Sequence, residues 1–239
     1  MKTTKRAWMI AGGLFGLLCL TFIGCQSFLY VASECAPDWV RVRQNKARAA
    51  RFLRAAEQGD AEAQREIGTC YFLGLGVPWD REEAVKWFHK SAEQGHAKAH
   101  YQLANCYYHG EGVPQNKAEA VRRYHTAAEL GDIEAQWKLG VRYLNGIEVP
   151  KDEAEAAKWF RKAAEQDYYY AQYLIGRCYF EGTGVPKDDA EAAKWLRKTS
   201  WLKDAAALLR EIESDNPRAP NPQWGEEASR ENPTPPIKK

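Results

Sequence analysis

Residues of the same type recur every 36 positions through most of this sequence. Four prolines, four glycines, four tyrosines and five alanines keep this step without a slip. They are Pro78, Pro114, Pro150 and Pro186; Gly74, Gly110, Gly146 and Gly182; Tyr71, Tyr107, Tyr143 and Tyr179; and Ala63, Ala99, Ala135, Ala171 and Ala207. Series this regular do not arise from composition. The region is therefore built from stacked copies of one structural unit, which excludes a single globular core.

Within one copy the apolar residues follow the period of two α-helices. The first helix has a stripe at i, i+1, i+4, i+7 and i+8, formed by Ala84, Val85, Phe88, Ser91 and Ala92. Gly95 interrupts the pattern. The inward face of a second helix follows, marked by Ala99, Leu103, Cys106 and Tyr107. The segment 110–114 ends this helix, because glycine supplies a left-handed cap and proline cannot continue the helix.

A helix-starting signal stands two residues after each repeated proline. It is an Asp or Asn followed three residues later by Glu, at Asp80–Glu83, Asn116–Glu119, Asp152–Glu155 and Asp188–Glu191. In such a capping box the first side chain accepts a hydrogen bond from a free N–H of the helix. The glutamate reaches back to the N–H of the cap residue. The pattern predicts where the first helix of each copy begins and gives both side chains a role there.

The repeated motif resembles the Sel1-like repeat, a relative of the tetratricopeptide repeat. It reads Ala84-x-x-Trp87-Phe88-x-x-Ser91-Ala92-Glu93-Gln94-Gly95, then Ala99, Leu103, Tyr107 and Gly110-x-Gly112-Val113-Pro114, and it covers about residues 46 to 200. The resemblance implies an all-α fold, an α/α superhelical solenoid of helix-turn-helix repeats. It also implies a non-catalytic scaffold or adaptor for protein complexes, often in the bacterial envelope.

Three positions depart from the repeated motif. Arg123 replaces a tryptophan, Glu148 replaces the second loop glycine, and Asp167 replaces the turn glycine. Because aspartate is one of the few residues that tolerate a left-handed turn, we expect the fold to survive at Asp167.

The chain divides into four segments around these repeats. Residues 1–24 are predicted to be a signal peptide or membrane anchor, and residues 25–44 a tether and N-terminal linker. Residues 45–213 form the solenoid, which a last helix over residues 205–212 caps. Residues 214–239 form a polar tail that holds six of the eleven prolines, so we expect the tail to be disordered.

The N-terminal segment has the layout of a bacterial export signal. Lys2, Lys5 and Arg6 precede an uncharged apolar stretch, and the segment 22–25 reads Phe-Ile-Gly-Cys. This tetrapeptide is similar to a lipobox, the site where lipoprotein signal peptidase cuts before an acylated cysteine. We therefore expect Cys25 to become the lipidated N-terminus and to tether the protein to the membrane.

The destination of the exported chain follows from the residues around Cys25. In the sorting rule of lipoproteins, Gln26 favours the outer membrane, so we expect an outer-membrane lipoprotein that faces the periplasm. An uncleaved signal anchor in the inner membrane is one alternative, because the apolar run is long enough to span a bilayer. Cleavage after Ser33, which releases a secreted protein, is another. All three place the solenoid outside the cytoplasm.

The charge of the chain excludes a dedicated nucleic-acid binder. Lys and Arg number 34 against 32 Asp and Glu, for a net charge of +2, and three of the basic residues belong to the export signal. The rest of the chain is close to neutral, whereas phosphate backbones require a basic excess. We expect a protein or peptide partner and no nucleic acid.

Three cysteines occupy one equivalent position in their copies, at Cys70, Cys106 and Cys178. Neighbouring helices pack about 8–10 Å apart, whereas a disulfide requires Cα atoms within about 7 Å. In the family that the repeats resemble, the branch with disulfides carries two cysteines per repeat, and this chain lacks the second. We expect three buried free thiols. The state of Cys35 stays open.

An alternative function in another class comes from the end of the repeats. Ser200-Trp201-Leu202-Lys203 matches the S-x-x-K motif and Ser214-Asp215-Asn216 matches S-D-N, two signatures of serine enzymes that act on β-lactams or peptidoglycan. The reaction needs elements from distant parts of a mixed α/β fold, whereas here they lie close together after a helical array. We therefore prefer a helix end for this segment and predict no catalytic residue.

The sequence contains two weak candidates for metal or cofactor binding. His96 and His100 stand at i, i+4, the spacing of a zinc pair on one helix face. However, the sequence fixes no third ligand, and His96 takes the position where Asp60 and Asp132 are expected to cap a helix. Gly74-x-Gly76 lacks the third glycine and the preceding strand of a phosphate-binding loop. We predict no bound metal and no cofactor.

Two surface features are candidates for partner binding. Basic residues recur on the first helix and would line a wall of the solenoid groove, where they could bind carboxylates of a partner segment. They are Lys86, Lys90, Arg122, Lys158, Arg161, Lys194 and Arg197. The plain alternative is a solvated face of ion pairs such as Glu82–Lys86 and Glu119–Arg123. The second feature is Tyr170, which takes a position that Glu62, Lys98 and Glu134 occupy in other copies and should be exposed.

Overall fold

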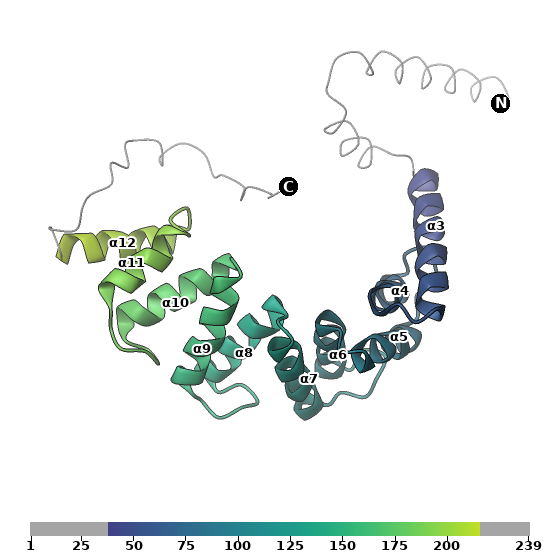
Figure 1. Ribbon diagram of the computed structural model, residues 1–239, viewed down its shortest axis with the longest axis horizontal. Helices are drawn as coiled ribbons and strands as arrows, with labels where there is room; N and C mark the ends of the chain where they lie inside the picture. The colour runs from purple at the N-terminus through teal and green to yellow at the C-terminus, as the bar shows by residue number, and fades with distance from the viewer. Residues whose placement is uncertain (1–37, 216–239) are drawn as a thin grey trace, which may run out of the picture.

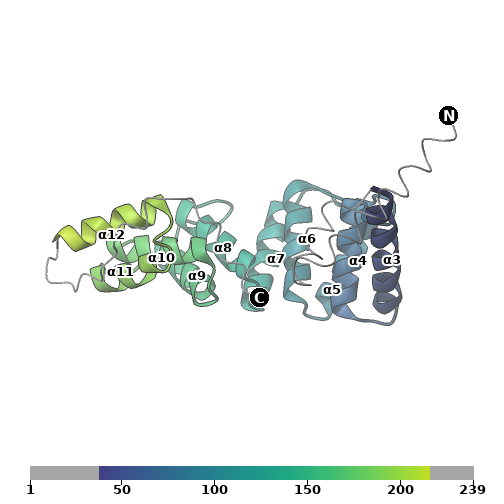
Figure 2. The same cartoon turned by 90° about the horizontal axis from the view of Figure 1, so that it is seen from above.

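The computed structural model describes residues 38–215, and within this range the chain consists of ten α-helices without a strand. The helices are α3 (Asp38–Glu57), α4 (Ala61–Leu73), α5 (Arg81–Glu93), α6 (Ala97–His109), α7 (Lys117–Glu129), α8 (Ile133–Asn145), α9 (Glu153–Glu165), α10 (Tyr169–Glu181), α11 (Asp189–Arg197) and α12 (Lys203–Asp215). Each helix packs mainly on the one before it and the one after it. Figure 1 shows the helices along a curved row, and Figure 2 shows the same row from above. The predicted all-α solenoid is confirmed.

The second helix of each copy begins and ends where the sequence predicts. Asp60, His96 and Asp132 cap α4, α6 and α8 by accepting from the N–H three residues later. The helices end at left-handed glycines, with φ of 68° at Gly74 and 73° at Gly110. These caps satisfy backbone groups that the helix leaves free at its ends.

The first helix of each copy also begins as predicted, but the capping box forms only in part. Asp80, Asn116, Asp152 and Asp188 accept from the N–H of the following glutamate. The prediction of a return bond from the glutamate is wrong. The N–H of each cap residue instead donates to the carbonyl of the repeated tyrosine in the preceding helix, for example Asp80 to Tyr71 at 3.0 Å. The glutamate side chain is thereby free to pair elsewhere.

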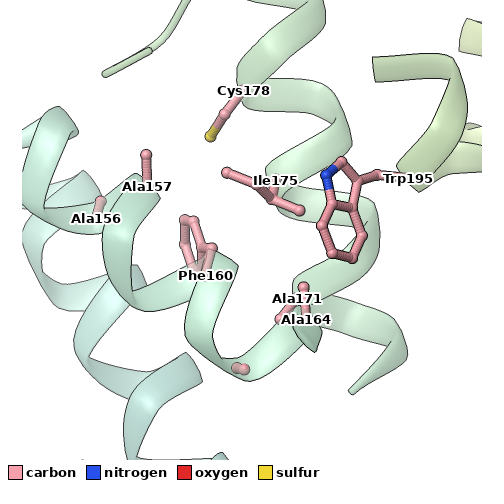
Figure 3. Close-up of a cluster of buried hydrophobic side chains, with 9 residues drawn as sticks. Ala156, Ala157, Phe160, Ala164, Ala171, Ile175, Cys178 and Trp195 are labelled. Atoms are coloured by element: carbon pink, nitrogen blue, oxygen red, sulfur yellow. The ribbon is translucent and has the colours of Figure 1, made fainter. Parts of the chain in front are cut away.

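One large side chain fills the same place in each copy. Phe88, Tyr124, Phe160 and Leu196 are fully buried at this position. In the cluster of Figure 3, Phe160 of α9 lies beside Ile175 of α10, with Cys178 and Trp195 nearby. Small residues of the second helices, such as Gly140 and Gly176, let these side chains approach closely. Burial of such side chains between copies is the main stabilising contribution in a stack of this kind.

Glutamine side chains tie successive copies together. Gln64, Gln136 and Gln172 each donate to the carbonyl eight residues earlier. Gln64 and Gln136 also accept from Gln94 and Gln166 of the next copy, at 2.7 and 2.9 Å. Buried amides that are satisfied in this way fix the offset between copies.

The departures from the motif are accommodated locally. Asp167 and Glu148 both adopt positive φ, at 62° and 56°. Glu148 pairs with Lys117 at 3.2 Å and with Arg142 at 3.7 Å. Arg142 stands where the other copies carry a cysteine, so two departures of the same copy pair with each other.

The two ends of the row differ from the repeated pattern. Helix α3 begins at Asp38, within the segment 25–44 that the sequence predicts to be a linker, because no glycine or proline interrupts the chain between Pro37 and Gly59. At the other end, the spacing predicts that Ala207 is buried. Ala205 is buried instead and Ala207 is exposed, because α11 has 9 residues where α9 has 13, and α12 begins at Lys203, two residues before the 36-residue step from Tyr169 would place it.

The cysteine prediction is confirmed for the described residues: Cys70, Cys106 and Cys178 are buried free thiols. Burial raises the pKa of Cys106 to about 12 and that of Cys178 to about 11, so both stay protonated at neutral pH.

The predictions on export fall on residues that the structure does not describe. Cys25, the segment 1–24, Cys35 and residues 216–239 lie outside the range 38–215. Among the helices of that range, none has both the length and the apolar character needed to cross a bilayer.

Candidate functional site

The basic residues of the predicted ladder are exposed, but they already have partners within the chain. Lys86, Arg122, Lys158 and Lys194 each pair with the glutamate three residues earlier, at 3.0 Å for Lys86 and 2.7 Å for Lys158. These are the glutamates released from the capping boxes. Lys86 thus pairs with Glu83 instead of the predicted Glu82, whereas the Glu119–Arg123 pair is present at 2.7 Å. The hydrogen bonds to Glu83 and Glu155 raise the pKa of Lys86 and of Lys158.

The remaining basic residues of the ladder lie against aromatic rings or carboxylates. Lys90 lies 3.9 Å from the centre of the Trp87 ring. Arg161 donates to the Tyr179 hydroxyl, and Arg197 lies 3.9 Å from Glu213. A partner carboxylate would have to compete with these contacts, each of which is weak at an exposed surface. Binding by the ladder stays a prediction.

Tyr170 belongs to a group of rings that the structure brings together from three places. We call this group the aromatic patch; it consists of Trp137 on α8, Tyr168, Tyr169 and Tyr170 at the start of α10, and Trp201 in the turn between α11 and α12. Tyr170 is 45% exposed and Trp201 is 42% exposed. The exposure predicted for Tyr170 is confirmed, and α12, which follows Trp201, lies at the end of the row (Figure 1).

The rings of the aromatic patch contact one another in a continuous series. The centres of the Trp201 and Tyr169 rings are 5.1 Å apart, and those of Tyr169 and Tyr170 are 4.1 Å apart. Tyr170 stacks on Trp137 at 6.1 Å. The hydrogen bond with Tyr170 raises the pKa of Tyr169 to about 12, so this hydroxyl is neutral at physiological pH. The result is a broad surface with apolar faces and polar edges.

The residues around these rings lack two features that stabilise the equivalent helix starts, a side-chain cap and a turn glycine. Tyr168 stands at the cap position of α10 and makes no side-chain cap bond, whereas Asp60, His96 and Asp132 cap the equivalent helices. A missing cap costs about 1 kcal/mol. The preceding turn holds Asp167 at positive φ, where the other copies have glycine. Departures from the usual cap residue and the usual turn glycine that occur together at an exposed place indicate a functional site.

A hollow of about 360 Å³ lies between the starts of α6 and α8. Its lining includes Leu130, Asp132 and Glu134. Burial is the main cause that raises the pKa of Tyr168, and the negative charge of Glu134 raises it further. The hollow carries charges of both signs, because Lys98 also lines it and its charge acts on Asp132.

Sequence reasoning identified Tyr170 but did not connect it with Trp201. Trp201 lies where the 36-residue pattern stops, so no spacing placed it beside Tyr169. The tyrosine at the cap position, Tyr168, was the signal available in the sequence, because every equivalent residue has a side chain that can accept a hydrogen bond.

The serine-enzyme motifs are not brought together. Ser200 precedes α12 and Ser214 lies in its last turn, so the helix separates them by about 20 Å. The Ser214 hydroxyl donates to the carbonyl of Glu211 at 2.8 Å. The motif residues of the described range thus belong to a helix start and a helix end.

The two histidines of the candidate zinc pair have different structural roles. His96 caps α6 through one ring nitrogen and contacts Glu62 at 2.6 Å through the other. His100 is buried and takes the position of Gln64, Gln136 and Gln172. Among the described residues, no cluster of three potential metal ligands occurs.

We expect His100 to make the protein less stable in mild acid. Burial and then the Arg123 charge lower the pKa of His100 below 6.5. The unfolded chain therefore binds a proton that the folded chain resists, and stability falls as the pH drops through about 6.5. Chemical denaturation at pH 7.5 and 5.0 should show a smaller loss for His100→Gln than for the wild type, by about 1 kcal/mol or less.

The exposed residue His109 offers the control for this measurement. His109→Gln makes the same chemical change at an exposed position and shows how much of any effect belongs to the substitution itself. Equal losses in wild type and His100→Gln would contradict the role assigned to His100.

Comparison with known proteins adds the family. The Sel1 repeat matches residues 41–60, 61–96, 97–132, 133–168 and 170–200. A Sel1 repeat protein from Oxalobacter formigenes is 35% identical with a TM-score of 0.68, and the alignment covers 70% of this chain and 50% of that one. A protective antigen of uropathogenic Escherichia coli with an SLR fold is 41% identical with a TM-score of 0.63, covering 70% of this chain and 36% of that one. This chain thus spans half or less of the length of these relatives. No curated protein matches it.

Proposed function

Because the chain belongs to the Sel1 repeat family, we propose that it is a non-catalytic scaffold of the bacterial cell envelope that holds a partner protein or peptide on its aromatic patch. Sel1 repeats generally serve as interaction scaffolds. The observation that carries the proposal is the series of contacting rings from Trp137 through Tyr170 and Tyr169 to Trp201, which is exposed at Tyr170 and Trp201 and begins a helix, α10, without a side-chain cap.

Aromatic rings of this kind suit protein recognition. Tyrosine and tryptophan are enriched among the residues that dominate binding energy, because they bury a large area at a low cost in side-chain entropy. Charged residues at the rim mainly set the rate and salt dependence of association. The basic ladder on the first helices fits this second role, since Lys158 and Lys194 are exposed and paired.

We expect loss of the exposed rings to weaken binding of the partner. The partner is first identified by crosslinking in intact cells and then purified. Tyr170→Ala with Trp201→Ala should reduce its affinity by about 30-fold or more, the effect of losing a hot spot, as measured by calorimetry. Trp79→Ala is the matched control, because Trp79 is 62% exposed and lies outside the aromatic patch.

The same titration separates the aromatic patch from the basic ladder. Lys158→Ala with Lys194→Ala should change the salt dependence and leave most of the affinity intact. If the lysine variant loses affinity and the tyrosine–tryptophan variant keeps it, the groove ladder is the binding site and the aromatic patch is not.

The tether is a separate part of the proposal. We propose that acylated Cys25 anchors the scaffold to the outer membrane, on the support of the lipobox-like segment 22–25. Cys25→Ala should abolish labelling by an alkyne fatty acid and release the protein from the membrane fraction. Ser33→Leu is the control for cleavage after Ser33. Labelling that persists in Cys25→Ala would contradict the lipoprotein.

A further inference from the structure

The aromatic patch has the chemistry of a surface that binds proline-rich segments. Within the described residues, Tyr170 and Trp201 keep nearly half of their surface exposed, although their rings are large and apolar. Grooves lined with such rings bind extended P-x-x-P segments, because the proline rings pack flat on the aromatic faces. The polyproline II helix also loses little entropy on binding.

This chain carries two segments of that type after α12. Pro217-Arg218-Ala219-Pro220 follows the helix directly, and Pro233-Thr234-Pro235-Pro236 comes later. We propose that the second segment, Pro233–Pro236, docks on the aromatic patch of its own chain. The inference concerns an occupant inside the molecule, so it holds or fails independently of any external partner.

The distances select the second segment. Helix α12 runs from Lys203 to Asp215, so Asp215 lies about 20 Å from Trp201 at the other end. Pro220 is five residues beyond Asp215 and reaches at most about 17 Å, even when fully extended. The 17 connecting residues 216–232 can span up to about 56 Å when fully extended. The second segment can therefore reach Trp201 without strain, and the first cannot.

Charge gives the docked segment a direction. Ile237, Lys238 and Lys239 follow Pro236. The charge of Glu134 on α8 acts on Tyr168, whose ring contacts Trp137 of the same helix α8, whereas Trp201 contacts Tyr169. A segment that enters at Trp201 and runs toward α8 brings its lysines to this carboxylate, where opposite charges attract.

A link of this length makes even a weak contact effective. Two sites joined by a short connection within one chain meet at effective concentrations in the millimolar range. A contact with a dissociation constant of about 0.1 mM would then be occupied in about nine chains of ten. Any ligand that binds the same rings has to displace the segment.

Photo-crosslinking within the full-length chain tests the proposal. A photoreactive side chain at residue 234, in place of Thr234, should crosslink to peptides that contain Tyr168–Tyr170 or Trp201, as mapped by mass spectrometry. The product should migrate as a monomer. The matched control carries the same group at residue 219, in the first segment, and should crosslink only to α12.

Proline variants show whether the yield of the photo-crosslink from residue 234 depends on docking. Replacing Pro233, Pro235 and Pro236 with alanine should lower the yield from residue 234 at least fivefold, and so should Tyr170→Ala. Replacing Pro217, Pro220 and Pro222 should leave the yield unchanged. These changes lie outside the packed helices or at an exposed ring, so the solenoid should fold. Equal yields in all variants, or crosslinks found only in dimers, would overturn docking within one chain.

Discussion

Phe160→Ala should lower the free energy of unfolding by about 3–5 kcal/mol, the usual cost of removing a buried aromatic ring. Phe160 is fully buried, and its ring lies beside Ile175 in the cluster of Figure 3, to which Trp195 also belongs. A Cβ added to Gly140 of α8 would overlap the same ring. The ring therefore fills space between α8, α9 and α10, and its removal leaves a cavity that joins two copies.

The loss should also change the shape of the unfolding transition. Each copy is stabilised mainly by its neighbours, so a cavity between two of them uncouples the parts of the solenoid on either side. Guanidinium denaturation followed by circular dichroism should show a broader transition for the variant than for the wild type.

The chain itself supplies the control for this substitution. Leu196 fills the equivalent place in the last copy and is fully buried there. Phe160→Leu should therefore cost about 1.5 kcal/mol or less, because a large apolar side chain is kept. If Phe160→Leu and Phe160→Ala were equally destabilising, ring shape rather than cavity volume would decide stability, against this account.

Repetition explains how much of the fold could be predicted from one sequence. A cap residue and a glycine recur at most helix boundaries, so successive copies repeat the same information. The return bond of the capping box could not be predicted, because it depends on where the Tyr71 carbonyl lies in the folded copy. The shift from Ala207 to Ala205 likewise depends on how the last turn packs.

The candidate site was less predictable than the fold for a related reason. Helical spacing shows which residues share a face. It correctly predicted that Tyr170 and the basic residues are exposed. It does not show whether a charge is already paired, as Lys158 is with Glu155. Nor does it relate a residue outside the repeats, such as Trp201, to a residue within them. Contacts between different copies or turns require coordinates.

Gly184→Ala should lower the free energy of unfolding by about 3 kcal/mol, the sum of a backbone cost and a steric cost. Gly184 has a φ of +69°, where a side chain costs roughly 1–2 kcal/mol. A Cβ there would also overlap the backbone oxygen of Glu153 at the start of α9. Because a carbonyl on a packed helix cannot rotate away, the loop would have to shift, which adds a cost of about 1–3 kcal/mol.

Gly131→Ala separates backbone strain from this close approach. Gly131 has a φ of +95° and no atom within 4 Å of a Cβ placed there, so alanine should cost only the backbone strain of roughly 1–2 kcal/mol. Glu148 shows what a side chain at the Gly184 position requires, because it is held by Lys117 and Arg142. Alanine has no charge to form such pairs, and Glu153 replaces the lysine in the copy of Gly184. Equal losses for the two variants in urea denaturation would show that strain alone matters and that the contact with α9 is not limiting.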